Sequence, residues 1–283
     1  DLHSFPTRRS SDLHIAHLKR AYLLSRGEIF LGSEDGGTGG AIDTGLLAYI
    51  RAFEAMRFRY DRKYSVSLAD SAAHLTWSDE RRFSRCANTA AYFPILYLPQ
   101  AAAITIGRHA GIHIAETYRL ARSFSLMATA GLILAALLIY PTPPIVLAIL
   151  FLPMTLFQLG SASQDAVSFG AAMLVGALLM RAADRRFFFS TALFVSLEIC
   201  LFALATSRIA LTALSLGPLA LSRIRNSRVF LLSSIAVTGL ALSWIWYAVL
   251  TIEGTTVRST SSTEVASSIW RSEERRVGKE CRS

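Results

Sequence analysis

Cysteine is scarce in this sequence, which has only Cys86, Cys200 and Cys281 among its 283 residues. The three lie far apart: one is in a polar region, one in an apolar run and one in the C-terminal tail. A disulfide framework or a structural zinc site needs more cysteines at short spacing. The sequence therefore predicts neither, and it indicates no cofactor.

Histidine pairs also lack the partners that metal chemistry needs. His14 and His17 are three residues apart, and His109 and His113 are four apart with Glu116 nearby, but no third ligand is evident. We interpret His14 and His17 as ordinary surface histidines, so a divalent metal has no support. The sequence shows no Ser-His-Asp or Cys-His arrangement, no nucleic-acid-binding motif and no internal repeat.

The two ends of the chain are related in an unusual way. DLHSFPTRRSSDL (1–13) and RSEERRVGKECRS (271–283) are encoded by opposite strands of one oligonucleotide, which resembles a sequencing-library adapter. Both tails are therefore expected to be assembly artefacts that pack against nothing. Leaving them out removes seven basic and five acidic residues, so the net charge falls from +9 to +7 and no longer indicates nucleic acid.

Charged residues are missing from long stretches of the second part of the chain. Residues 14–88 carry eleven basic and nine acidic residues, whereas charges between Tyr92 and Thr251 are few and clustered. The apolar runs between these clusters are long enough for membrane spans, which need about 20 residues. Runs such as LMATAGLILAALLIY have no polar face, as a soluble bundle would require. The sequence predicts an all-α, polytopic membrane protein.

Six spans are predicted from runs that end at proline or arginine clusters. They cover residues 119–140, 144–160, 166–181, 187–205, 208–222 and 229–250. Gly217-Pro218 predicts a kinked or tilted helix in the fifth of these. A further run from Phe93 to Gly107 contains Pro94 and Pro99 and is short for a span, so it either crosses or forms a juxtamembrane or re-entrant segment. The transmembrane domain, residues 92–251, thus has six to seven spans.

The basic loops RAADRR and RIRNSR predict the orientation. Two spans separate them, so they share a side, and the positive-inside rule makes that side cytoplasmic. The turn at 160–165 and the start of the first span then lie outside. If 93–107 does not cross, residues 14–91 are also outside, in the periplasm or extracellular space of an inner-membrane protein. We prefer this arrangement.

The polar region 14–91 is predicted to be an external region with amphipathic helices near 14–26 and 44–60. Its segment GSEDGGTGGAID has neither the position nor the spacing of a phosphate-binding loop, so we expect a flexible surface loop. Residues 252–270 are expected to begin a following external loop.

Six stretches of the sequence match one family pattern. They are NTAAYFPILYLPQA (88–101), GR (107–108), YRLA (118–121), LPMTLFQLGSASQDA (152–166), HLKRAYLLSRG (17–27) and GGAIDTGL (39–46). Together they cover nearly all of 14–230 and resemble the predicted bacterial membrane proteins of domain-of-unknown-function family 2142. Tyr-Leu-Pro-Gln is the most specific part.

The resemblance implies a layout similar to that of GT-C-fold membrane glycosyltransferases. Those enzymes use polyprenyl-phosphate-linked sugars and an acidic residue in the first external loop. In the family, a first transmembrane helix and an Asp-Glu pair stand immediately before the position of His17, where this chain has the tail. The expected general base is therefore missing, and this fragment is expected to be inactive. Arg122 also replaces what is more often an asparagine.

With this resemblance, four residues are candidates for binding a lipid-linked substrate: Arg119, Arg122, Asp165 and His17. A guanidinium matches phosphate geometry, although both arginines also suit a helix end at the membrane surface. Asp165 either faces a lipid-substrate pocket at the outer membrane surface or is a helix cap, since Ser161, Ser163 or Asp165 can accept the free N–H groups at the start of the next helix.

Glu198 and Arg208 lie within apolar sequence, and we expect a structural ion pair between neighbouring helices there.

Two functions follow from the resemblance. One is a glycosyltransferase-like protein that moves a sugar from or onto a polyprenyl-phosphate carrier for cell-envelope polysaccharide, with Arg119 on the phosphate. The alternative is a non-catalytic transporter or assembly partner that binds lipid in the same pocket.

Overall fold

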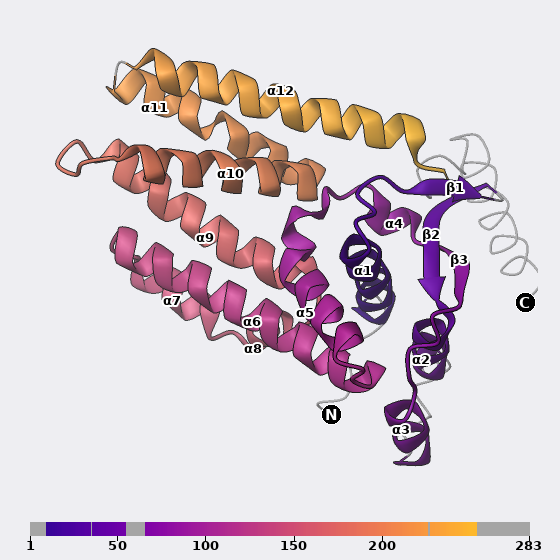
Figure 1. Cartoon of the computed structure of the whole chain (residues 1–283). Helices are drawn as coiled ribbons and strands as arrows, with labels where there is room; N and C mark the ends of the chain where they lie inside the picture. The colour runs from indigo at the N-terminus through magenta and orange to yellow at the C-terminus, as the bar shows by residue number, and fades with distance from the viewer. Residues whose placement is uncertain (1–9, 35, 55–65, 226, 254–283) are drawn as a thin grey trace, which may run out of the picture.

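The computed structural model describes residues 10–34, 36–54, 66–225 and 227–253. Long apolar helices form a bundle, and shorter helices and strands form a layer across one end of it (Figure 1). The elements are α1 (Ser10–Ser25), β1 (Gly32–Glu34), β2 (Gly37–Asp43), α2 (Thr44–Glu54), α3 (Val66–Ala73), β3 (Arg81–Arg85), α4 (Ala87–Ala90), η1 (Pro94–Tyr97), α5 (Leu98–His109), α6 (Ile114–Ile139), α7 (Pro144–Leu150), α8 (Pro153–Leu159), α9 (Gln164–Ala183), α10 (Thr191–Ser207), η2 (Ile209–Leu216), α11 (Gly217–Arg225) and α12 (Arg228–Thr251). We call the elements from α1 to α5 the N-terminal layer and those from α6 to α12 the helical bundle.

The N-terminal layer has its own core, built around α1. Tyr22 and Leu23 are fully buried there with Ile42 of β2 and Ile104 of α5. Most of α1 from His17 to Leu23 is buried, so this helix is a central element and not the amphipathic surface helix that we expected near 14–26. It begins at Ser10, inside the expected adapter tail, while residues 1–9 and 271–283 lie outside the described part.

The second helix of the layer keeps the predicted amphipathic pattern. In α2, Leu46, Leu47 and Ile50 are buried, whereas Arg51 is exposed. The structure describes this helix as far as Glu54, and the rest of the expected 44–60 lies outside the described part.

The glycine-rich segment forms a sheet and is not the flexible loop that we expected. The strands are antiparallel in the order β1-β2-β3, with Gly39 opposite both Gly32 and Arg85. A Cβ atom added at Gly39 would lie 2.2 Å from the carbonyl oxygen of Ser84, so only glycine fits there. The protein is therefore the mainly helical, membrane-like fold that the sequence predicts, with one small three-stranded sheet added to it. Glycine here indicates the close approach of two strands, not flexibility.

Asp43, at the end of β2, joins the sheet to α2 and to the loop before β3. Its Oδ1 accepts the Gly45 N–H at 2.8 Å and caps α2. Its Oδ2 accepts the Ser78 and Asp79 N–H groups at 3.2 and 2.9 Å. Asp79 has a φ of 59°, in the left-handed region that non-glycine residues rarely adopt. Asp43 thus holds a strained loop in place.

The segment 93–107 does not cross the bundle. α5 has twelve residues and is about 18 Å long. Gln100 near its start donates to Ser125 Oγ of α6 at 3.1 Å, whereas Gly107 near its end lies against Thr117. α5 therefore runs back along the first half of α6. Because the Phe93 N–H donates to the carbonyl oxygen of Thr206, the segment 93–107 starts at the end of the bundle where α6 begins and α10 ends.

Three helices are long and apolar enough to span a membrane: α6, α9 and α12. They contain or closely match the predicted spans 119–140, 166–181 and 229–250. α6 and α9 approach closely, because a Cβ atom added at Gly170 would lie 3.0 Å from the Thr129 carbonyl oxygen. Small residues at helix contacts are typical of membrane bundles.

The predicted span 144–160 is two short helices. α7 and α8 have seven residues each and are separated just before Pro153, which cannot continue a helix. The broken pair still runs back along α6, because Arg122 Nε donates to the Gly160 carbonyl oxygen at 2.8 Å. The broken pair therefore runs along the part of α6 between Ile139 and Arg122, which is about 26 Å long.

The predicted span 187–205 is one regular helix, whereas the predicted span 208–222 is not. α10 is apolar and has seventeen residues. The region 208–222 consists of the 3₁₀-helix η2, which passes into α11 at Gly217, so the predicted irregularity is confirmed. In the described residues, the six predicted spans thus become three long helices, one shorter helix and two broken segments.

The two predicted basic loops lie together at one end of the bundle, which we call the arginine-rich end. Arg225 donates to the Ala182 carbonyl oxygen at 2.5 Å and also to that of Asp184. Arg181 donates to the Ile139 carbonyl oxygen at 2.8 Å. The prediction that the two loops share a side is confirmed.

The opposite end of the bundle, which we call the layer end, closes onto the N-terminal layer. Trp244 Nε1 of α12 donates to the Ala91 carbonyl oxygen at 2.9 Å. Just after α12, the Glu253 N–H donates to Thr38 Oγ1 at 2.8 Å, and the Thr38 N–H donates to the Glu253 carbonyl oxygen at 3.2 Å. The chain therefore leaves α12 on the layer side. Residues 254–270 of the expected following loop lie outside the described part.

Candidate functional site

An ion pair joins two helix termini at the layer end. The N-cap of α9 is Ser163, whose Oγ accepts the Asp165 N–H at 3.3 Å, so Asp165 is not the cap. Asp165 Oδ1 instead lies 2.5 Å from Arg208 Nη2. Asp165 is in the first turn of α9 and Arg208 follows the last turn of α10, and both positions match the signs of the helix dipoles.

The expected partnership of Arg208 with Glu198 is wrong. Ten residues along a helix correspond to about 15 Å, which is too far for an ion pair within α10. Both carboxylate oxygens of Glu198 are buried and have no hydrogen-bond partner among the described residues. An ion pair between neighbouring helices does exist, but its acid is Asp165.

Asp165 also borders an apolar pocket between α8 and α9, with a volume of about 180 Å³. The pocket is lined by Asp165, Phe169, Met154, Thr155, Gln158 and Leu159. The Arg208 side chain is 50 % exposed and the Asp165 side chain 17 %, so the arginine is the accessible partner. A charged head group bound there would have an apolar slot beside it.

The two other candidate arginines lie on α6. Arg122 is used structurally, because its Nε holds the Gly160 carbonyl oxygen where the chain enters α9. Arg119 is exposed, and within the described residues its guanidinium makes no hydrogen bond or ion pair. It lines neither of the two pockets described here.

His17 is fully buried, so our interpretation of it as a surface histidine is wrong. Its Nδ1 lies 2.5 Å from the Tyr97 hydroxyl, and its ring stacks on Tyr92. Burial raises the pKa of Tyr97 well above its ordinary value, and the negative charge of Asp165 acts in the same direction. Tyr97 thus contacts His17, whereas Arg119 and Arg122 are not part of this contact. A histidine surrounded by aromatic residues is not distinguishable from a surface one by spacing alone.

No metal site supports the other histidines. Among the described residues, no group of three or more His, Cys, Asp or Glu side chains is placed to hold a metal ion. His113 is exposed just before α6, and the side chain of His14 lies outside the described part.

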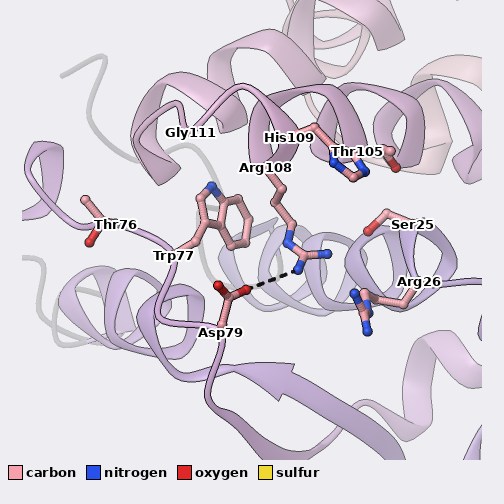
Figure 2. Close-up of a pocket in the computed structure, with 9 residues that line it drawn as sticks. All are labelled: Ser25, Arg26, Thr76, Trp77, Asp79, Thr105, Arg108, His109 and Gly111. Carbon is pink, nitrogen blue, oxygen red and sulfur yellow. Dashed lines mark ion pairs between the residues drawn. The ribbon is translucent and has the colours of Figure 1, made fainter.

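A larger cavity of about 450 Å³ lies within the N-terminal layer, and we call it the layer pocket. Figure 2 shows its lining: the end of α1, the end of α5 and the loop before β3. The lining residues are Ser25, Arg26, Thr76, Trp77, Asp79, Thr105, Arg108, His109 and Gly111. Arg108 Nη2 lies 3.6 Å from Asp79 Oδ1, and the guanidinium lies over the rings of Tyr22 and Trp77 at 5.4 and 5.7 Å.

Sequence reasoning missed this pocket. The available signal was Gly107-Arg108 within the family pattern. A Cβ atom added at Gly107 would lie 2.4 Å from Thr117 Oγ1, so glycine lets α5 pack against α6 and places Arg108 at the end of the helix. The contacts of Arg108 with Trp77 and Asp79 depend on the folded loop, which no local pattern predicts.

Comparisons with known proteins agree with the fold. A family model described as a predicted membrane protein, DUF2142, matches residues 11–270. No curated protein and no solved structure matches the chain. Since the family match covers most of the sequence and the structure contains three helices able to span a membrane, the chain belongs to the DUF2142 family of predicted membrane proteins.

Proposed function

We propose that this chain is a glycosyltransferase-like inner-membrane protein that acts with a polyprenyl-phosphate carrier in cell-envelope polysaccharide synthesis. The observation that carries the proposal is the Asp165–Arg208 pair beside the apolar pocket between α8 and α9. Ionisable groups within membrane helices are costly and usually functional. A phosphate on an isoprenoid chain combines the charge and the apolar body that this site suits.

The proposed topology places this site outside the cytoplasm. The positive-inside rule assigns the arginine-rich end, with Arg185, Arg186, Arg223 and Arg228, to the cytoplasm. The N-terminal layer then faces the periplasm or the extracellular space. In this topology the broken segments α7–α8 and η2–α11 cross together with α6, α9, α10 and α12, which makes six passes.

Two arginines are proposed to meet the carrier phosphate. Arg208 is half-exposed beside the pocket, and Arg119 is exposed on α6 at the same end of the bundle. A guanidinium binds a phosphate through paired charge-assisted hydrogen bonds. Asp165 orients Arg208 when the carrier is absent, and Arg122 fixes the turn that precedes α9.

In the transfer step, a carboxylate removes the proton from an acceptor hydroxyl as its oxygen attacks the anomeric carbon of the sugar. The bond from that carbon to the phosphate oxygen breaks, and the carrier phosphate leaves with the electron pair. The arginines stabilise the charge on the leaving phosphate. The acidic pair that the family resemblance places before His17 would be the base, so the assay for transfer uses a chain that carries it.

One observation favours the alternative of a non-catalytic lipid-binding protein. Asp165, the acidic residue in the pocket, is already paired with Arg208. Its Oδ1 therefore already accepts a hydrogen bond from within the chain, before any acceptor hydroxyl arrives. In this alternative the same pocket binds the carrier without sugar transfer.

The binding step is tested with the purified chain in nanodiscs, using undecaprenyl phosphate and undecaprenol as probes. We expect saturable binding of the phosphate only, weakened at least about tenfold in Arg208→Gln. Arg223→Gln, which makes the same change of charge at the arginine-rich end, is the matched control. Equal binding of the two probes, or an equal effect of the two variants, would contradict the carrier site.

The transfer step separates the two functions. Sugar transfer from a polyprenyl-linked donor by the extended chain, abolished when the acidic pair is replaced, supports the enzyme. Carrier binding without transfer from any polyprenyl-linked donor supports the lipid-binding alternative.

A further inference from the structure

We propose that the layer pocket binds a sugar unit that carries an oxyanion, either a carboxylate or a phosphate. This site lies in the N-terminal layer, is separate from the Asp165–Arg208 pair and does not depend on the carrier proposal. Its volume of about 450 Å³ is within the usual range for small-molecule sites.

The charges of the pocket favour an anion. Arg26 and Arg108 line it, His109 adds a ring that can donate a hydrogen bond, and the one acidic residue in the lining is Asp79. Asp79 is 89 % exposed, and its oxygen lies 3.6 Å from the arginine, which is beyond a normal hydrogen bond. Such an exposed pair is weak. A ligand oxyanion can therefore displace Asp79 at small cost.

Arg108 is oriented in advance for this role. Its guanidinium lies over the rings of Tyr22 and Trp77, and its side chain is only 19 % exposed. Its Nε is buried and has no acceptor among the described residues, so part of its hydrogen-bonding capacity is unused. Stacking also limits the entropy that the side chain loses on binding.

The remaining walls suit a sugar ring. The Trp77 indole is a flat apolar wall whose orientation is set by a 3.0 Å hydrogen bond from Nε1 to the Ile112 carbonyl oxygen. Ser25, Thr76 and Thr105 add hydroxyl groups that can donate to or accept from sugar hydroxyls. Figure 2 shows Ser25 and Arg26 on the other side of Arg108 from Trp77. A simple inorganic anion would use the arginine but not these groups.

Backbone strain occurs at the rim of the same pocket. Asp79 has a φ of 59° and is held by the bond from its N–H to Asp43 Oδ2. Such strain is found at functional sites more often than elsewhere. It places the Asp79 carboxylate opposite Arg108, where it acts as an internal substitute for the ligand anion.

The test is isothermal titration calorimetry of the purified full chain in detergent micelles. The probes are glucuronate, glucose 1-phosphate, glucose and inorganic phosphate. We expect saturable binding of at least one of the two anionic sugars and much weaker binding of glucose and of inorganic phosphate. The two anionic probes distinguish a carboxylate from a phosphate ligand. Undecaprenyl phosphate binding is measured separately, so failure here leaves the carrier site untouched.

Two variants identify the pocket. Arg108→Gln should weaken binding of the anionic sugar at least about tenfold. Because Arg108 also stacks on Tyr22, Asp79→Asn provides a second, milder change: it removes the competing anion and should tighten binding about two- to fivefold. Asparagine tolerates the left-handed backbone. Asp70→Asn on the exposed face of α3 is the matched control and should have no effect.

Three results would overturn the proposal. One is the absence of saturable binding by both anionic sugars. Another is equal affinity for glucose or for inorganic phosphate. The third is unchanged affinity in Asp79→Asn and in a folded Arg108→Gln chain.

Discussion

Buried polar side chains have different hydrogen-bond partners in the N-terminal layer and in the helical bundle. In the layer, buried charges reach across the chain: Asp43 holds a loop 35 residues away, and the fully buried Arg20 donates to the Glu28 and Ile29 carbonyl oxygens. In the bundle, many hydroxyls bond within their own helix, as Thr129 does to the Ser125 carbonyl oxygen and Ser196 to that of Ala192. Tertiary structure thus depends on polar contacts in the layer and mainly on apolar packing in the bundle.

In the proposed topology the layer faces water and the bundle faces lipid, and the difference follows from these two surroundings. In water the hydrophobic effect drives the layer together, and its few buried polar groups then fix a unique arrangement. In lipid the exterior is as apolar as the core, so that driving force is lost and close packing replaces it. Exposed Leu138, Phe151 and Leu232 are consistent with a lipid-facing surface.

The largest expected effect is in the layer. Asp43→Ala removes the acceptor of the α2 cap and of the Ser78 and Asp79 N–H groups, so we expect a loss of about 3 kcal/mol or more in the stability of the layer. Hydrogen exchange of residues 76–85 measures it. Asp43→Asn keeps one acceptor and should lose less. Unchanged protection of the Asp79 amide in the alanine variant would disprove this role.

The next effect tests apolar packing in the bundle. Leu201 of α10 is fully buried and Leu232 of α12 is 65 % exposed, although both are leucines on apolar helices. Leu201→Ala should cost about 2 kcal/mol or more, whereas Leu232→Ala should cost much less, because only the first leaves a cavity. Equilibrium unfolding in mixed detergent micelles compares the two. Equal costs would mean that the bundle core is assigned wrongly.

The stability of the N-terminal layer should fall at alkaline pH because the Cys86 thiol is buried in it. Burial raises the pKa of the Cys86 thiol above its ordinary value of about 9. Above that pH the unfolded chain releases a proton that the folded chain retains, so stability is full below about pH 9 and falls as pH rises. One such group contributes at most about 1.4 kcal/mol per pH unit. Thermal unfolding of the layer at pH 8 and pH 10 should show this slope, and Cys86→Ala should reduce it. Identical slopes would exclude Cys86 as its source.

The smallest effect concerns bundle hydroxyls. Ser196 bonds within α10 and is exposed, so Ser196→Ala should change stability by less than about 0.5 kcal/mol. Ser125 is buried and accepts the Gln100 amide from another helix at 3.1 Å, so Ser125→Ala should cost about 1 kcal/mol more. A larger loss in Ser196→Ala would show that the exposed hydroxyl has a partner outside this chain.

Local patterns predicted the parts of the fold that depend on local physics. Hydropathy located α6, α9 and α12, and the arginine clusters located the turns at one end. The break within 144–160 was also visible, since Pro153 stands in that run, but the overall apolar character hid it. The sheet was missed because glycine allows both a loop and the close approach of strands.

The candidate sites depend on contacts that no local pattern contains. Asp165 and Arg208 are 43 residues apart, and Trp77 and Ile112 are 35 apart. Asp165 was recognised as a candidate because it stands between two predicted spans, in the stretch 152–166 that matches the family pattern. Arg108 was not, because an arginine at the end of an apolar run also suits the membrane surface.

The pairing of Thr38 with Glu253 sets an order of events during synthesis. The two residues are 215 positions apart, so at roughly 5–20 residues per second the ribosome needs about 10–40 s to supply the partner. During that time β2 exists without this contact while the helices of the bundle are still being made. This hydrogen bond between the layer and the end of α12 therefore forms only after the helices of the bundle have been made.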